Sequence, residues 1–163
     1  MTAPVRAFVG VGANLGDALA TARAALQALG RLPDTRLVAC SSLYRSAPVE
    51  ASGPDFINAA AELLTTLPAL ALLHRLQAIE QEFGRLRSVR NAPRTLDLDL
   101  LVYGDGVLSS DELTLPHPRA HLRAFVLLPL SEIDPRISLP GLGPIAPWLA
   151  RAADQAIDKV AAG

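Results

Sequence analysis

Leucine and aspartate alternate from Leu96 to Leu100, and this pattern constrains the fold more than any other stretch. Successive side chains of a β-strand point to opposite faces, so the leucines face one way and Asp97 and Asp99 the other. Aspartate is depleted in strands, and two carboxylates on one face repel each other. The stretch therefore predicts either an ordinary half-buried strand or a strand whose carboxylates bind cations. Carboxylates about 6–7 Å apart suit a pair of Mg²⁺ ions, which also take phosphate oxygens and waters as ligands.

Four arginines precede this strand: Arg85, Arg87, Arg90 and Arg94. The guanidinium group is a planar, permanently charged fork that fits phosphate oxygens. Carboxylates for a metal and arginines for phosphate, within one short stretch, indicate a site for a magnesium-bound polyphosphate.

Composition limits the classes of protein to be considered. The chain has 163 residues, of which 50% are hydrophobic and 19% are charged, so we expect a single globular domain spanning residues 1–163. A net charge of −1 provides no overall field for attracting nucleic acid or an anionic membrane. We therefore expect small-molecule substrates, neither of those partners, and a monomer.

The single cysteine, Cys40, excludes an intramolecular disulfide and a cysteine-cluster metal site. Its strand-like surroundings predict a small buried residue. The first residues lack the three-part pattern of a signal peptide, and no apolar run reaches membrane-spanning length. We expect a soluble, cytoplasmic protein.

The order of predicted elements indicates an α+β fold. Strands at residues 5–11, 37–44 and 56–64 and the aspartate strand are interspersed with helices at residues 17–30 and 68–84. Strand–helix–strand–strand–helix–strand is the ferredoxin-like βαββαβ arrangement, with helices packed on a largely antiparallel sheet. A short helix at residues 125–133 and a final helix containing Trp148, Leu149 and Ile157 would form a C-terminal helical addition.

The first predicted strand leads into a glycine-rich stretch. Gly10, Gly12 and Gly16 match neither the dinucleotide-binding fingerprint nor a P-loop, so we predict a structural turn from Gly12, followed by a helix capped near Asp17.

Two polar residues have unusual surroundings. Asn58 lies in an apolar strand, so it is either a satisfied core amide or an amide that reads a ligand. His117 stands between two prolines in a segment that we expect to be rigid and exposed, and Arg119, His121 and Arg123 nearby suggest an anion site. The long connection at residues 45–55 is also expected to be functional.

Several motifs, taken together and in order, resemble one family. They are Gly10–Asp17 (GVGANLGD), Ser42–Arg45 (SLYR) with Pro48, Asp55–Asn58 (DFIN), Glu80 with Gly84–Arg85, Pro93–Asp99 (PRTLDLD) and Pro116–Arg119 (PHPR). This set resembles 6-hydroxymethyl-7,8-dihydropterin pyrophosphokinase of folate biosynthesis over nearly the whole chain, weakening after about residue 140.

The resemblance implies that pyrophosphate passes from ATP to the hydroxymethyl group of the pterin and that AMP is released. It implies that Asp97 and Asp99 hold two Mg²⁺ ions and act in catalysis with Arg85 and Arg94. It assigns ATP contacts to Gln77, Arg87, Arg94, His117, Arg119 and Arg123. It assigns pterin contacts to Ser46, Pro48, Val49, Phe56, Asn58 and Phe125, with the two phenylalanines stacking on the ring.

The sequence departs from the family pattern in two places and leaves other functions open. Phe56 stands where tyrosine is common, and Asn91 stands where many members carry an aromatic residue in a closing loop. No general base is evident. One alternative is a nucleotidyltransferase, although Gly84-Arg85 replaces the usual Gly-Ser pair before its aspartates. Another is a non-catalytic ferredoxin-like domain, which would bind its ligand without Mg²⁺.

Overall fold

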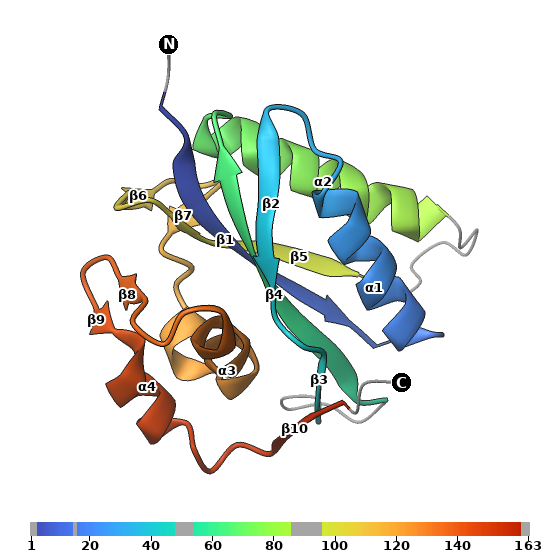
Figure 1. Cartoon of the computed structure of the whole chain (residues 1–163), viewed down its shortest axis with the longest axis vertical. Helices are drawn as coiled ribbons and strands as arrows, with labels where there is room; N and C mark the ends of the chain where they lie inside the picture. The colour runs from blue at the N-terminus through green and yellow to red at the C-terminus, as the bar shows by residue number, and fades with distance from the viewer. Residues whose placement is uncertain (1–2, 15, 48–53, 86–95, 161–163) are drawn as a thin grey trace.

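The computed structural model describes residues 3–14, 16–47, 54–85 and 96–160, with Arg85 described by its backbone alone. Its centre is an antiparallel sheet (Figure 1). The strands of this sheet are β1 (Val5–Ala13), β2 (Thr35–Cys40), β3 (Tyr44–Ser46), β4 (Phe56–Thr65), β5 (Asp97–Tyr103) and β10 (Ile157–Lys159). The order is β10-β3-β4-β1-β5, and β2 also pairs with β4. This order confirms the predicted ferredoxin-like α+β fold.

Helices α1 (Ala18–Leu29) and α2 (Ala69–Arg85) pack on one face of the sheet. As predicted, Asp17 caps α1, because its side chain accepts a hydrogen bond of 3.1 Å from the Ala20 backbone N–H. The buried apolar sheet residues of this face are Ala7, Val9, Val11, Ile57, Ala59, Ala61, Leu63, Leu98 and Leu100. We call it the closed face.

The other face is covered only in part, by η1 (Ala120–Leu122), α3 (Ala124–Ile133) and α4 (Ile145–Arg151). In Figure 1 these helices gather at the bottom left, away from α2. The hairpin of β8 (Ser138–Leu139) and β9 (Gly143–Pro144) packs with these helices. A second core forms there against sheet residues Phe8, Ala60, Leu101 and Val102. We call this the open face. The hairpin of β6 (Leu108–Ser109) and β7 (Thr114–Leu115) lies beyond β5, and its Leu115 packs in the core of the closed face.

A β-bulge in β5 lies beside this second core. Val9 pairs with Leu100, whereas the preceding Phe8 pairs with Val102, so Leu101 is an extra residue in the ladder. Leu101 and Val102 both belong to the core under α3 as a result.

Three elements differ from the sequence predictions. The expected strand at residues 37–44 is divided into β2 and β3, because Ser41 turns back onto β4: its backbone N–H donates to Ala60 O, and its Oγ accepts from Ala60 N, both at 2.9 Å. Gly12 and Ala13 extend β1 instead of beginning the turn.

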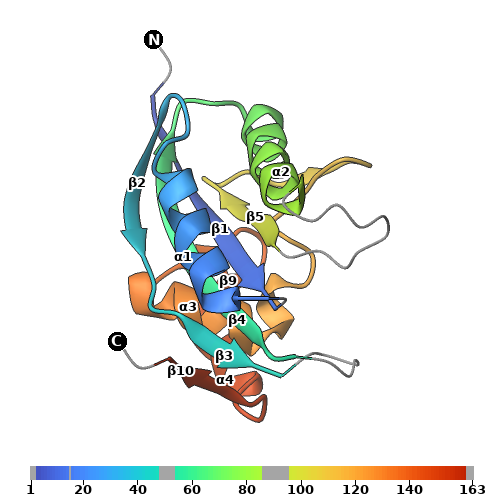
Figure 2. The ribbon, with the colours of Figure 1, turned by 90° about the vertical axis from the view of Figure 1, so that its right-hand side faces the viewer.

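At the C-terminal end, α4 stops at Arg151, and Ile157 belongs to β10. Figure 2 shows β10 lying beside β3 at the lower edge of the molecule. Cys40 is exposed, not buried, because it ends the edge strand β2, whose side chains alternate between half-buried and exposed. Among the described residues, the structure contains no helix of the length and apolar character needed to span a membrane.

Candidate active site

The uncovered half of the open face forms a cavity of about 220 Å³. Gly12 of β1 pairs with Asn58 on one side and Asp97 on the other, and Gly10 pairs with Asp99. Because glycine has no side chain, the middle strand forms a floor between the polar side chains of its neighbours. The residues around this central cavity are Gly10, Val11, Gly12, Ser46, Ala47, Phe56, Asn58, Ala59, Asp97, Asp99, Arg123, Phe125 and Val126.

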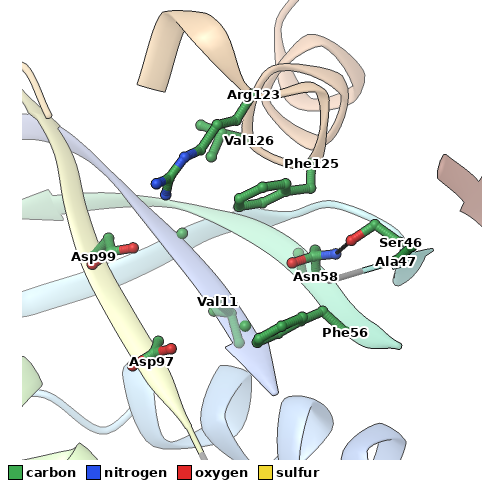
Figure 3. A pocket seen from close by; sticks show the side chains of 13 residues that line it. Val11, Ser46, Ala47, Phe56, Asn58, Asp97, Asp99, Arg123, Phe125 and Val126 are labelled. Atoms are coloured by element: carbon green, nitrogen blue, oxygen red, sulfur yellow. Dashed lines mark hydrogen bonds between the residues drawn. The ribbon is translucent and has the colours of Figure 1, made fainter. Parts of the chain in front are cut away.

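Two aromatic rings face each other across the central cavity (Figure 3). Phe56 is the first residue of β4, and Phe125 lies in the first turn of α3. The guanidinium carbon of Arg123 lies 5.4 Å from the centroid of the Phe125 ring. The slot between the rings suits a flat ligand, because aromatic rings favour offset stacking.

Asn58 lies between the two rings and is only 3% exposed (Figure 3). Its Nδ2 donates a hydrogen bond of 2.7 Å to Ser46 Oγ. This bond orients the amide, and Oδ1 lies 3.7 Å from the point that a Cβ atom on Gly12 would occupy. Oδ1 and the second N–H of Nδ2 are thereby held toward the cavity as an acceptor and a donor for a ligand.

Asp97 and Asp99 project from β5 at the other end of the cavity (Figure 3). As the alternation predicted, they lie on the face opposite to Leu98 and Leu100, which are buried in the closed face. Between them, the Leu98 backbone N–H donates a hydrogen bond of 2.7 Å to Glu80 Oε2 of α2. This bond fixes β5 against α2 at the residue that separates the two aspartates.

Asp99 also lines two adjoining cavities. One, of about 380 Å³, lies along α2 and includes Gln77 and Glu80; we call it the α2 cavity. The other, of about 260 Å³, lies beside the β6–β7 hairpin and includes His117; we call it the hairpin cavity. An extended ligand can therefore pass Asp99 while occupying more than one of the three hollows.

The carboxylate oxygens of the central cavity suit a hard cation that takes few ligands from the protein. Within the described ranges, no group of three or more His, Cys, Asp and Glu side chains is placed to hold a metal ion. A zinc or calcium site built wholly from protein would need such a group. Mg²⁺ instead binds through one or two carboxylates together with substrate phosphates and waters, so Asp97 and Asp99 fit it.

His117 is half-buried, which corrects the expectation that it is exposed. Its backbone N–H donates to Leu101 O at 2.9 Å, and this bond fixes the proline-flanked segment to β5. Burial lowers the pKa of His117, and Arg123 and Arg119 lower it further, whereas Asp99 opposes them. Nδ1 accepts a hydrogen bond of 3.2 Å from the Arg119 backbone N–H, so the neutral ring carries its proton on Nε2.

The structure brings together seven of the predicted site residues around the central cavity: Ser46, Phe56, Asn58, Asp97, Asp99, Arg123 and Phe125. Gln77 and His117 line the adjoining cavities, and Arg119 is exposed beside His117. The remaining predicted site residues lie outside the described residues, as do Arg90 and Asn91. They are Pro48, Val49, Arg87, Arg94 and the side chain of Arg85.

Glu132 of α3 is a residue that sequence reasoning missed. It accepts hydrogen bonds from the Ser42 N–H and Oγ, both at 2.9 Å, and from Tyr44 OH at 2.5 Å. Burial alone would raise the pKa of Glu132, but these bonds and Lys159 bring the pKa below its usual value. Glu132 ties the helix that carries Phe125 to the strand that carries Ser46. In the sequence, the position of Glu132 in an otherwise mostly apolar helix is the feature that could have indicated such a role.

Comparison with known proteins identifies the family. Residues 8–135 match the family described as 7,8-dihydro-6-hydroxymethylpterin-pyrophosphokinase. The chain belongs to this family. A 2-amino-4-hydroxy-6-hydroxymethyldihydropteridine pyrophosphokinase of Pseudomonas aeruginosa is 48% identical over 136 residues, covering 83% of this chain and 84% of the relative. One of Haemophilus influenzae is 40% identical over 157 residues, covering 96% and 98%.

Solved structures share the fold at low sequence identity. In the HPPK-DHPS of Plasmodium falciparum, solved with pterin and p-hydroxybenzoate, the TM-score is 0.73 at 13% identity. The match covers 93% of this chain and 43% of that one. Family membership makes this chain an ATP-dependent pyrophosphokinase of folate synthesis. An enzyme is thereby favoured over the non-catalytic ligand-binding domain.

Proposed function

We propose that this pyrophosphokinase transfers the pyrophosphoryl group of MgATP to the hydroxymethyl oxygen of 6-hydroxymethyl-7,8-dihydropterin and releases AMP. In this reaction a bond forms between the hydroxymethyl oxygen and the β-phosphorus. The bond between the β-phosphorus and the oxygen shared with the α-phosphate breaks, and the hydroxyl proton is released.

The aromatic slot is the proposed pterin site. Phe56 and Phe125 would stack on the two faces of the ring, and Asn58 would pair with its amide edge. The support is geometric, because Asn58 lies between the rings and Ser46 holds its orientation. Pro48 and Val49 would complete this edge through their backbone, on the ground of the sequence resemblance.

The proposed reacting centre lies between the slot and Asp97 and Asp99. We propose that these carboxylates hold two Mg²⁺ ions, which would neutralise the triphosphate and stabilise the attacking and leaving oxygens of an in-line displacement. The carboxylates would also orient the hydroxymethyl group, since they line the same cavity as the rings.

The nucleotide would extend from the reacting centre into the adjoining cavities. Arg123 projects from the start of α3 into the central cavity (Figure 3), where its fixed charge would bind phosphate oxygens. His117 would donate from Nε2 to the triphosphate, with Arg119 beside it, and Gln77 would contact the nucleotide in the α2 cavity.

We extend the proposal to three arginines on sequence grounds. Arg85 and Arg94 would stabilise the charge of the transferring group, and Arg87 would bind the nucleotide. Their positions immediately before the aspartate strand support this assignment.

The observation that carries the proposal is the presence, in one cavity, of paired carboxylates, an aromatic slot and an oriented buried amide. The deciding experiment mixes the protein with MgATP and 6-hydroxymethyl-7,8-dihydropterin and separates the nucleotides and pterins by chromatography. We expect AMP and a pyrophosphorylated pterin in equal amounts, and no product when EDTA removes the metal. ADP would mean transfer of a single phosphoryl group, and absence of turnover with the pterin still bound would contradict the proposed reaction.

A further inference from the structure

We infer that Gln155 is a positioning residue that sets the direction of Arg123. Its side-chain amide bridges the two peptide groups on either side of Arg123. Gln155 Nε2 donates to Leu122 O, and Gln155 Oε1 accepts from Ala124 N–H, both at 2.9 Å. Only one orientation of the amide satisfies both partners, because a carbonyl needs a donor and an N–H needs an acceptor.

The backbone at Arg123 requires such support. Arg123 separates η1 from α3 and has an extended conformation, with φ −121° and ψ 118°. It occupies the N-cap position of α3, yet among the described residues its side chain makes no capping bond. The first N–H of α3, on Ala124, has no acceptor within the helix, as at the start of any helix, and Gln155 supplies one from 31 residues along the chain.

Gln155 is itself held in place. Its backbone N–H donates to Ala152 O at 3.0 Å, and two residues later the chain enters β10, where Ile157 pairs with Ser46. The segment between α4 and β10 is therefore fixed at both ends, and this holds Gln155 beside Arg123. This segment lies beyond residues 8–135, the part of the chain that matches the family.

Fixing both peptide groups fixes the Cα–Cβ direction of Arg123, and that direction carries the guanidinium into the central cavity (Figure 3). Without the bridge, the extended junction could rotate and move the charge by an ångström or more. Displacements of that size cost up to about 10²-fold in rate in preorganised sites, so losing the bridge should remove part of the contribution of Arg123. The inference rests on the proposed function in that Arg123 binds the phosphates of ATP.

The test is a double-mutant cycle on the full chain, with Gln155→Ala, Arg123→Ala and the double variant. The exposed Gln27→Ala on α1, at the closed face, is the matched control. The readout is kcat/KM for MgATP at saturating pterin. We expect Gln155→Ala to lower it about tenfold, Arg123→Ala about 10²-fold and Gln27→Ala less than about twofold. In the Arg123→Ala background, Gln155→Ala should change it by less than about twofold.

A second readout does not depend on activity. In Gln155→Ala, amide hydrogen exchange at Ala124 should accelerate about three- to tenfold, because its N–H loses its acceptor. Central strand amides, such as that of Val9, should exchange as in the wild type.

The outcomes separate the inference from the proposed function. A wild-type chain that forms no AMP contradicts the proposed function before any variant is made, and the inference falls with it. An active wild type in which Gln155→Ala behaves like Gln27→Ala overturns the inference alone. Multiplicative effects in the double variant also overturn it, because they would show that Gln155 acts independently of Arg123.

Discussion

Neighbouring residues of the same three strands form a packed core on one face of the sheet and line a cavity on the other. On the closed face, Val9, Ile57 and Leu98 are buried against α1 and α2. One residue away in each strand, Gly10, Asn58 and Asp97 line the central cavity of the open face. Because side chains alternate in a strand, a step of one residue takes the chain from the packed core to the central cavity.

This difference separates stability from function. The closed face removes apolar side chains from water, which is the main favourable term in folding. The uncovered half of the open face places two carboxylates close together and omits side chains at Gly10 and Gly12. We therefore expect changes on the closed face to affect folding and changes in the cavity to affect turnover.

The largest effect should come from Asp99→Asn in the open face. We expect turnover to fall by about 10³-fold or more, because the amide cannot replace the carboxylate as a ligand for Mg²⁺. The free energy of unfolding should change less than in a core truncation, because Asp99 lines the open-face cavity and not the packed core. Steady-state assays and urea titration measure the two quantities, with the exposed turn variant Asp105→Asn as control. Full activity in Asp99→Asn would remove the metal assignment.

The reverse behaviour is expected for Leu63→Ala on the closed face. Leu63 is 0% exposed, so its truncation should lower the free energy of unfolding by about 2–5 kcal/mol. Turnover per folded molecule should be unchanged, because Leu63 faces away from the cavity. Leu70→Ala, at a position 40% exposed on α2, should change stability by less than about 0.5 kcal/mol. A specific loss of turnover in Leu63→Ala would break the separation between the faces.

Gly12→Ala tests the floor of the cavity. The added Cβ would lie 3.7 Å from Asn58 Oδ1 and 3.9 Å from Phe56 Cδ1, which are ordinary contacts, so the fold should tolerate it. The methyl group would occupy part of the pterin slot, and we expect the KM for the pterin to rise about tenfold with stability unchanged. An unchanged KM would show that the ring does not reach this floor.

The smallest effect concerns the link between α3 and β3. Burial, followed by the hydrogen bond to Glu132, raises the pKa of Tyr44 above its usual value. The stability this phenol contributes is therefore present below about pH 10 and is lost as the pH rises from there toward the folded-state pKa. Tyr44→Phe should cost about 1 kcal/mol near neutral pH and show a smaller alkaline loss in urea titrations. Equal alkaline losses in both proteins would contradict this assignment.

The sequence predicted those parts of the site that depend on local periodicity. Alternation alone placed Asp97 and Asp99 opposite the buried leucines, and the order of elements gave the ferredoxin-like fold. The roles of Phe56, Asn58 and Phe125 came from family resemblance, because nothing local shows that residues so far apart share a cavity.

Features that depend on long-range packing were missed. Gly12 was expected in a turn. The neighbouring sequence does not distinguish a turn glycine from a strand glycine that lies between two other strands. Ile157 was assigned to a helix because its strand exists only through pairing with β3. Burial of His117 depends on its bond to Leu101, and exposure of Cys40 depends on β2 being at the sheet edge.

The pairing of β10 with β3 has a consequence for how the enzyme is made. Ribosomal synthesis proceeds from the N-terminus, so the other five strands of the sheet and both aspartates emerge before residues 155–160. Until then, the outer edge of β3 beside Ser46 has no strand partner, and Ala124 has no acceptor from Gln155. The nascent chain can thus form its closed face first, while the backbone beside Ser46 and Arg123 is completed only when this later segment docks.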